Sequence, residues 1–137
     1  MSVVPDDADL IDVLQAKLRR YPHVRYEGSA YHLSILPLDE HGFRIDVIVR
    51  QHSYSVSCDG WYTQFREASD ALDCVELALS ESTRLEVWVR GKTRYRWILQ
   101  RRSKQGWATV GERTALLRPF WRRRRIVYLQ NRLLEAA

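Results

Sequence analysis

The sequence has little cysteine, glycine, proline or methionine, with 2, 6, 4 and 1 residues of these types among 137. The two cysteines, Cys58 and Cys74, are too few for the disulfide framework of a small secreted domain, and their separation matches no zinc-binding pattern. We expect both to be small buried hydrophobes rather than reactive thiolates. No stretch is of low complexity, which argues against a linker-like or fibrous chain. The sequence therefore predicts a folded protein in a reduced, cytoplasmic setting.

Long apolar runs are also missing. No run approaches the roughly 20 residues that a helix needs to cross a bilayer. The opening residues MSVVPDDADL lack the basic and apolar regions of a signal peptide. We therefore expect no membrane partner. We also expect a single domain over residues 1–137, since a chain of this length normally forms one hydrophobic core.

The motifs of common enzymes are absent as well. The chain has no G-x-S-x-G, no phosphate-binding Walker loop, no dinucleotide-type glycine pattern and no H-E-x-x-H. The histidines never stand four residues apart on a predicted helix, so we expect surface or hydrogen-bonded residues rather than metal ligands. Asp46, on the polar face of a predicted strand, is a candidate base without an identifiable partner. The sequence thus predicts no catalytic residue, no cofactor, no metal site and no small-molecule ligand, and it disfavours an enzyme.

What the sequence does have is an uneven distribution of charge. Residues 1–83 carry 7 Lys and Arg against 14 Asp and Glu, a net charge of −7, and residues 84–137 carry 15 against 3, a net charge of +12, which gives the total of +5. Such an asymmetry indicates an anionic partner for the basic part. Two simpler explanations stay open. In the first, the acidic and basic parts neutralise each other within one fold or between subunits. In the second, the excess of arginine over lysine reflects the codon usage of a GC-rich genome.

Hydrophobic periodicity predicts the elements of the first 80 residues. Aspartates that can cap a helix precede an apolar-periodic run, and Pro22 stops it, so we place a helix at 6–20. Period-two alternation predicts three strands, and a small aliphatic stripe at helical spacing predicts a second helix. The strands lie at about 31–36, 43–50 and 54–58, and the second helix lies at 65–80.

The last third of the chain should be a strongly twisted antiparallel meander. Its strands are expected at about 85–90, 94–102, 106–110 and 121–129. The element order is then α-βββ-α-ββββ, with the strands in antiparallel runs. This order favours an α+β fold over a doubly wound sheet.

One side of the strand at 85–90 is apolar, with Leu85, Val87 and Val89. For this side to meet the apolar side of the next strand, Val87 must pair with Trp97 and Val89 with Tyr95, because side chains alternate with period two. That register requires a three-residue loop at 91–93 or a bulge. A two-residue turn that begins on the glycine would suit the loop sequence better. Burial of one face specifies register more strongly than turn preference, so we expect the loop or the bulge.

The other side of the meander is cationic and aromatic. The candidate binding residues are those that this register places there or that alternate with them in 121–129: Trp88, Arg94, Arg96, Arg122, Arg124 and Tyr128. Guanidinium groups make bidentate contacts with phosphates or carboxylates, and an adjacent indole can stack on a base. The simpler alternative is that these arginines are ion-paired or solvated and protect a sheet edge from unwanted pairing.

Three classes of function follow from this face. The first is a small non-enzymatic protein-interaction module or homodimer, in which an acidic N-terminal surface meets a basic C-terminal surface, because Trp and Arg are enriched in protein interfaces. The alternative is binding of nucleic acid or another polyanion through the arginine and aromatic sheet face. The third and least favoured class is an enzyme. We therefore expect a protein partner or self-association, with nucleic acid as the alternative partner.

Overall fold

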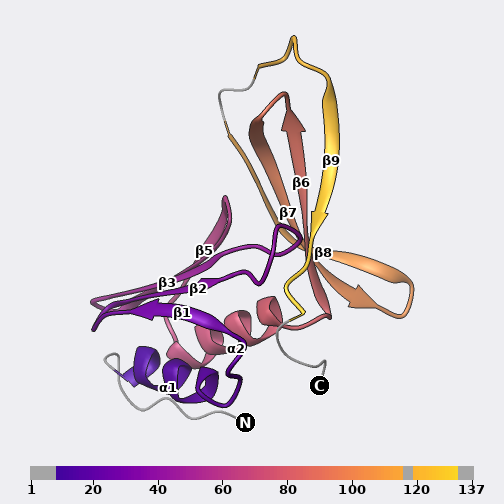
Figure 1. The fold of residues 1–137 in the computed structure, drawn as a ribbon. Coiled ribbons are helices and arrows are strands. Elements are labelled where there is room, and N and C mark those ends of the chain that lie inside the picture. The colour runs from indigo at the N-terminus through magenta and orange to yellow at the C-terminus, as the bar shows by residue number, and fades with distance from the viewer. Residues whose placement is uncertain (1–8, 116–118, 133–137) are drawn as a thin grey trace.

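The structure, a computed structural model, describes residues 9–115 and 119–132 (Figure 1). Two helices and two antiparallel sheets make an α+β fold, as the sequence predicts. In chain order the elements are α1 (Asp9–Leu18), β1 (Arg25–Gly28), β2 (His32–Leu36), β3 (Ile45–Arg50), β4 (Ser53–Cys58), β5 (Trp61–Phe65), α2 (Ala68–Leu79), β6 (Thr83–Arg90), β7 (Thr93–Ser103), β8 (Gly106–Thr114) and β9 (Arg124–Leu129).

The observed order matches the predicted order with two strands added between the helices. β1 is an edge strand of four largely polar and exposed residues, so it carries no apolar alternation that could reveal it. β5 follows a two-residue turn and pairs with β4, so Phe65 ends a strand instead of beginning the second helix, and α2 starts at Ala68. α1 ends at Leu18 rather than at 20, and the predicted helix residues 6–8 lie outside the described residues.

The first sheet has the strand order β1-β2-β3-β4-β5, and both helices lie on one of its faces (Figure 1). Alternate residues of β3 and β4 are buried toward the helices, among them Val47 and Val56, which are fully buried. The stripe of α2 that meets them is small and aliphatic, which lets the helix lie close to the sheet. Full burial of each Val, Leu or Ile side chain stabilises the fold by roughly 1.5–3 kcal/mol.

The second sheet is not the meander that the sequence predicts. Its strand order is β8-β7-β6-β9, so β9 pairs with β6 rather than with β8. Burial explains why β6 has a neighbour on each side. Every second residue of β6 is buried, and in a central position both of its edges are paired with another strand. β8 runs on to Thr114 and β9 begins only at Arg124, so the predicted strands 106–110 and 121–129 are respectively too short and too long.

Two tryptophan rings join the sheets. Trp97 of β7 lies over Gly60, in the turn between β4 and β5, where an added Cβ would stand 2.2 Å from the ring. Trp61 of β5 lies over Gly111 of β8, where an added Cβ would stand 3.0 Å from the indole nitrogen. Asp59, beside the first glycine, accepts a hydrogen bond of 2.7 Å from the indole nitrogen of Trp97. Each sheet therefore contributes a ring that packs on a glycine of the other sheet.

The hairpin between β6 and β7 satisfies both its turn and its buried face. Val87 pairs with Trp97, as predicted, but Val89 pairs with Arg94 instead of Tyr95, because a bulge shifts the register between Trp88 and Val89. The chain reverses over two residues rather than three, and the first of them, Gly91, has a φ of 63° that favours glycine. The bulge turns Tyr95 toward the side of Trp88 and leaves Arg94 on the side of the core.

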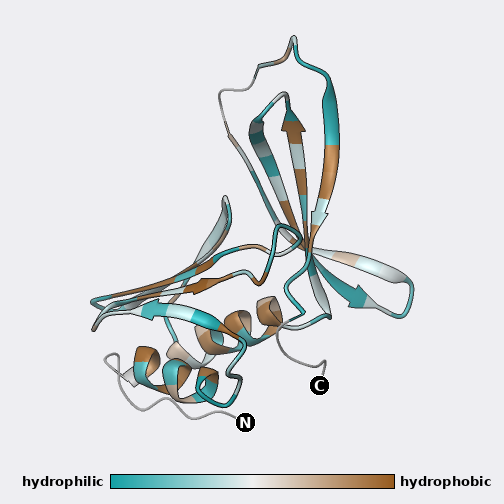
Figure 2. Cartoon of the chain, in the orientation of Figure 1, coloured by the Kyte–Doolittle hydropathy of each residue, from teal (hydrophilic) through white to brown (hydrophobic). Residues whose placement is uncertain are grey.

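The far end of the second sheet extends away from the helices and the first sheet (Figure 1). The turn between β6 and β7 and the segment leading into β9 lie at this end, which we call the tip. Figure 2 shows hydrophobic and hydrophilic residues alternating along β6 and β7, and β9 turning hydrophilic toward the tip. The strongest positive charge of the chain, Arg122–Arg125, therefore stands far from the acidic helices.

Candidate functional site

The side of the second sheet opposite the buried valines of β6 is an arginine and aromatic surface, which we call the outer face. The strand pairings and ring contacts place on it Arg84, Glu86, Trp88, Arg90, Tyr95, Arg96, Arg102, Trp107, Glu112, Arg124, Ile126 and Tyr128. The inner side carries Leu85, Val87, Val89, Leu99, Val127 and Leu129. Period-two alternation separates the two sets along β6 and β9, although Arg125 of β9 pairs with Val89 on the inner side, and the bulge exchanges the predicted sides of Arg94 and Tyr95.

Trp88, at the centre of the outer face, is flanked by two guanidinium groups. Arg96 of β7 lies 4.5 Å from the centroid of the indole ring and Arg124 of β9 lies 4.6 Å from it. The indole nitrogen donates a hydrogen bond of 2.9 Å to Glu86. Cations above an indole are attracted by its negatively charged π face. The ring is therefore occupied by the protein's own arginines and orders them, rather than standing open to stack on a base.

A second set of such contacts lies nearer the first sheet, where one guanidinium group packs on two aromatic rings. The guanidinium group of Arg84 lies 4.1 Å from the ring centroid of Tyr128 and 4.4 Å from that of Trp107. Arg102 packs on the same indole at 5.1 Å. Stacked guanidinium groups keep the N–H groups at their edges available for hydrogen bonds in the plane. The outer face therefore holds a series of arginines whose donors are oriented by aromatic rings.

Carboxylates neutralise little of this charge. On the outer face Arg96 pairs with Glu112 at 2.8 Å, and on the inner side Arg94 pairs with Asp59 at 2.9 Å, which joins the basic third to the acidic half. None of Arg122–Arg125 forms an ion pair with a carboxylate within residues 9–115 and 119–132. Among the ion pairs of the described residues, the acidic half thus neutralises Arg94 of the basic third. The rest of the charge asymmetry is not explained by internal ion pairs of these residues.

The structure brings four of the six predicted binding residues onto one surface, namely Trp88, Arg96, Arg124 and Tyr128. Arg122 precedes β9 and lies against Gly91, with its carbonyl oxygen accepting a hydrogen bond from Arg90. The placement of Arg94 on the outer side is wrong, because the bulge turns it to Asp59.

Among the arginines and tryptophans of the outer face, sequence reasoning missed Arg84, Arg102 and Trp107. Arg84 shares the alternation of Glu86 and Trp88, so period two alone could have revealed it. The other two became visible only with the pairing of β7 and β8, whose register shifts between Leu99 and Gln100.

A serine, histidine and aspartate do meet on the first sheet, but not in a nucleophilic arrangement. His32 Nε2 lies 3.0 Å from an oxygen of Asp46 and 3.3 Å from Ser34 Oγ, so one ring nitrogen faces both partners. A catalytic triad needs the serine and the aspartate on opposite ring nitrogens. Ser34 and Arg44 donate to the same carboxylate. Asp46 is therefore a carboxylate that these hydrogen bonds hold in place within the first sheet.

Replacing Asp46 with asparagine should cost about 1–2 kcal/mol of stability at neutral pH, because charge-assisted hydrogen bonds are lost. Burial alone would raise the pKa of Asp46, but hydrogen bonds from Ser34, His32 and Arg44 outweigh it and hold the pKa below 3.8. A lowered pKa in the folded state stabilises the fold above the unfolded value and loses that contribution as the pH falls through the folded value. Urea unfolding at several pH values should show the two proteins converging below about pH 3.8. A difference that stays constant down to pH 2 would contradict this assignment.

Both thiols should react slowly in the folded protein. Burial raises the pKa of the Cys74 thiol to about 11 and that of the fully buried Cys58 well above its usual range. Only the thiolate is nucleophilic. We expect alkylation by iodoacetamide at pH 8 to be at least about 100-fold slower than for free cysteine, and to become fast in urea. Rapid modification of one thiol in the folded chain would instead identify a reactive cysteine.

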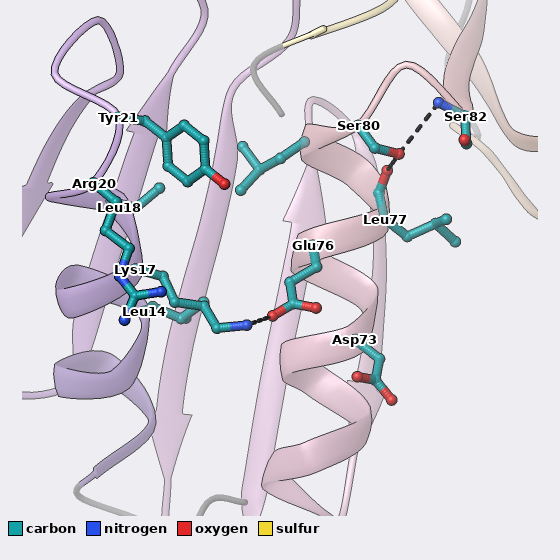
Figure 3. Close-up of a pocket in the computed structure, with 11 residues that line it drawn as sticks. Leu14, Lys17, Leu18, Arg20, Tyr21, Asp73, Glu76, Leu77, Ser80 and Ser82 are labelled. Carbon is teal, nitrogen blue, oxygen red and sulfur yellow. Dashed lines mark hydrogen bonds and ion pairs between the residues drawn. The ribbon is translucent and has the colours of Figure 1, made fainter. Parts of the chain in front are cut away.

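A groove of about 440 Å³ separates α1 from α2 (Figure 3). Leu14, Leu18 and Leu77 supply apolar lining, and an ion pair between Lys17 and Glu76 crosses between the helices. This lining suits apolar contact rather than a reaction. Within the described residues no group of three His, Cys, Asp or Glu side chains could hold a metal ion, and neither helix is long and apolar enough to span a membrane.

The outer face is thus the part of the described structure with the most unusual chemistry. Comparison of the chain with protein-family models, with curated proteins and with solved structures gave no match.

Proposed function

We propose that this chain is a small non-enzymatic protein-interaction module that presents its outer face to an acidic protein surface, and that a second copy of the chain carries one such surface on α2. The observation that carries the proposal is the series of outer-face guanidinium groups that aromatic rings hold in place. Apart from Arg96, they have no carboxylate partner in the described residues.

The ring contacts favour binding because they reduce its entropic cost. A free arginine loses much rotamer freedom when it forms an ion pair across an interface. Arg84 and Arg124 already pack on rings, so less of that freedom remains to be lost. Bidentate contacts between such groups and carboxylates add specificity of geometry.

The acidic half offers a surface of the matching sign. α2 contains Asp70, Asp73 and Glu76 and no basic residue, and Glu67 precedes it directly. Asp70, Asp73 and Glu67 are exposed, whereas Glu76 pairs with Lys17. A basic sheet face at one end of the molecule and an acidic helix at the other suit a head-to-tail contact between copies.

Apolar exposure favours a protein surface over nucleic acid. Ile126 and Tyr128 on the outer face are 40% and 48% exposed. Tyrosine and arginine are enriched at protein interfaces and lysine is depleted there, which matches a face whose cations are all arginines. The indole of Trp88 already holds two guanidinium groups, so a role as a base-stacking platform loses support.

Two measurements test this proposal. Light scattering at low and high ionic strength should show a self-associated species that dissociates as salt screens the charges. Fluorescence anisotropy should show salt-sensitive binding of a labelled oligo-glutamate peptide, which stands in for an acidic protein surface. A protein that is monomeric at low ionic strength and ignores the acidic peptide would exclude the proposal.

One observation favours nucleic acid as a second candidate. The run Arg122–Arg125 stands at the projecting tip without ion pairs in the described residues, and cations so placed can neutralise successive phosphates. A gel shift with a single-stranded oligonucleotide tests this candidate. Retention that exceeds binding of the acidic peptide, with a steep loss on adding salt, would favour nucleic acid over protein.

A further inference from the structure

A recess opens where the outer face meets the loop between β2 and β3. Its volume is about 580 Å³, within the range of roughly 300–1,000 Å³ found for small-molecule sites. The second sheet supplies one wall with Arg84, Arg102, Trp107 and Tyr128, and part of the other comes from Leu38, Asp39, His41 and Gly42. The recess lies at the opposite end of the outer face from the tip.

The lining of this recess is strongly cationic. Arg84, Arg102 and Arg132 line it, against one carboxylate, Asp39, which accepts a hydrogen bond of 2.8 Å from the backbone of His41. None of the three arginines is ion-paired to a carboxylate in the part of the chain that the structure describes. Like charges gathered in a concave site focus the electrostatic potential and attract an anion.

The contacts that position the three guanidinium groups leave some of their N–H donors available for a ligand. Arg84 lies against Tyr128 and Trp107 and uses its Nε on Gln100 at 2.7 Å, which leaves its two terminal nitrogens. Arg102 packs on the indole ring of Trp107, and Arg132 uses its Nε on Gln130 at 2.8 Å. These side chains are therefore positioned by the fold before any ligand arrives.

The wall opposite the sheet is fixed in place as well. The backbone of Gln130 donates to the carbonyl oxygen of His41 at 2.7 Å. The buried Asn131 accepts from the backbone of Phe43 and donates to the carbonyl oxygen of Ala78. These bonds tie the end of β9 to the loop and to α2, so the recess is preformed.

We propose that this recess binds the phosphate group of a small phosphorylated molecule, with Arg84, Arg102 and Arg132 as its anion ligands. A phosphate monoester carries about −1.5 to −2 charges and three acceptor oxygens, which matches three guanidinium groups better than a carboxylate does. The volume beyond the arginines accommodates the remainder of such a molecule. This site shares Arg84, Arg102, Trp107 and Tyr128 with the outer face, but its occupant is a small molecule, so the proposal does not depend on the protein contact proposed above.

Titration calorimetry with inorganic phosphate and with a nucleoside monophosphate tests the site. Arg102→Gln should weaken binding of both probes by about tenfold or more, as expected for the loss of a charge-assisted hydrogen bond. Arg101→Gln is the matched control, because Arg101 pairs with the buried Thr83, does not line the recess and carries the same charge. It should change the affinity by less than about threefold, through net charge alone.

Three results would overturn the proposal. They are no binding of either phosphate probe by the intact chain at millimolar concentration, equal losses in the two variants, and tighter binding of a phosphoserine peptide than of the nucleoside monophosphate. The last result would assign the recess to a phosphorylated protein instead of a small molecule. None of them bears on salt-sensitive binding of the acidic peptide, so failure here is distinguishable from failure of the proposed function.

Discussion

Replacing Gly60 with alanine is expected to lower the free energy of unfolding by about 3 kcal/mol, the upper end of the range for overpacked sites. The new Cβ would stand 2.2 Å from two ring carbons of Trp97. That ring cannot move aside cheaply, because its nitrogen is bonded to Asp59 and its strand is paired on both edges. The substitution therefore acts on the joint between the two sheets, and urea unfolding measures it.

Gly28→Ala is the matched control for this effect. Its added Cβ would stand equally close, at 2.2 Å, to the amide nitrogen of Gln15. That atom ends a flexible side chain that can rotate away, so we expect a change below about 1 kcal/mol. Trp97→Leu should partly rescue Gly60→Ala, with a coupling energy of about 1–2 kcal/mol in the double-mutant cycle. Equal losses in the two alanine variants would mean that Trp97 does not hold the joint.

The sequence predicts the fold class because its clearest periodicities coincide with buried faces. The alternation of 43–50 and the helical stripe of 65–80 each correspond to an observed element with that face in the core. β1 was not predicted because it has no buried residue and is held by its pairing with β2, whereas β5 was missed although its burial alternates from Trp61 to Phe65. Strands held by their neighbours rather than by their own pattern are not visible in a single sequence.

The candidate site was predictable only as far as alternation along single strands reaches. Period two identified the side of β9 that carries Arg124 and Tyr128, and the side of β6 that carries Trp88. It failed at Arg94, since the extra residue in the bulge reverses the side of the β7 residues between the turn and the bulge. The strand order was not predictable either, because the alternation of residues 121–129 indicates which side chains share a face but not whether the strand pairs with β6 or with β8.

Reversing two charges at the start of β9, Arg124 on the outer face and Arg122 just before the strand, in the double variant Arg122→Glu and Arg124→Glu, is expected to weaken binding of the oligo-glutamate peptide by at least about 100-fold. Each reversal removes an attraction and places a like charge against the ligand, which costs on the order of 1.4 kcal/mol or more per site. The Arg124 change also removes one of the two cations on Trp88. Anisotropy at low ionic strength measures the loss, and the residual affinity should depend less on salt than that of the unchanged protein.

The double variant Arg19→Glu and Arg66→Glu separates the position of charge from its amount. Both arginines are exposed and belong to the acidic half, and each pair of reversals removes four units from the net charge of +5. If the proposed function is right, this control loses less than about threefold in affinity, because distant exposed charges are largely screened. Equal losses in the two double variants would mean that net charge, and not the ordered arginines of the outer face, governs binding. Circular dichroism of both variants checks that the fold persists, which it should because all four side chains are exposed.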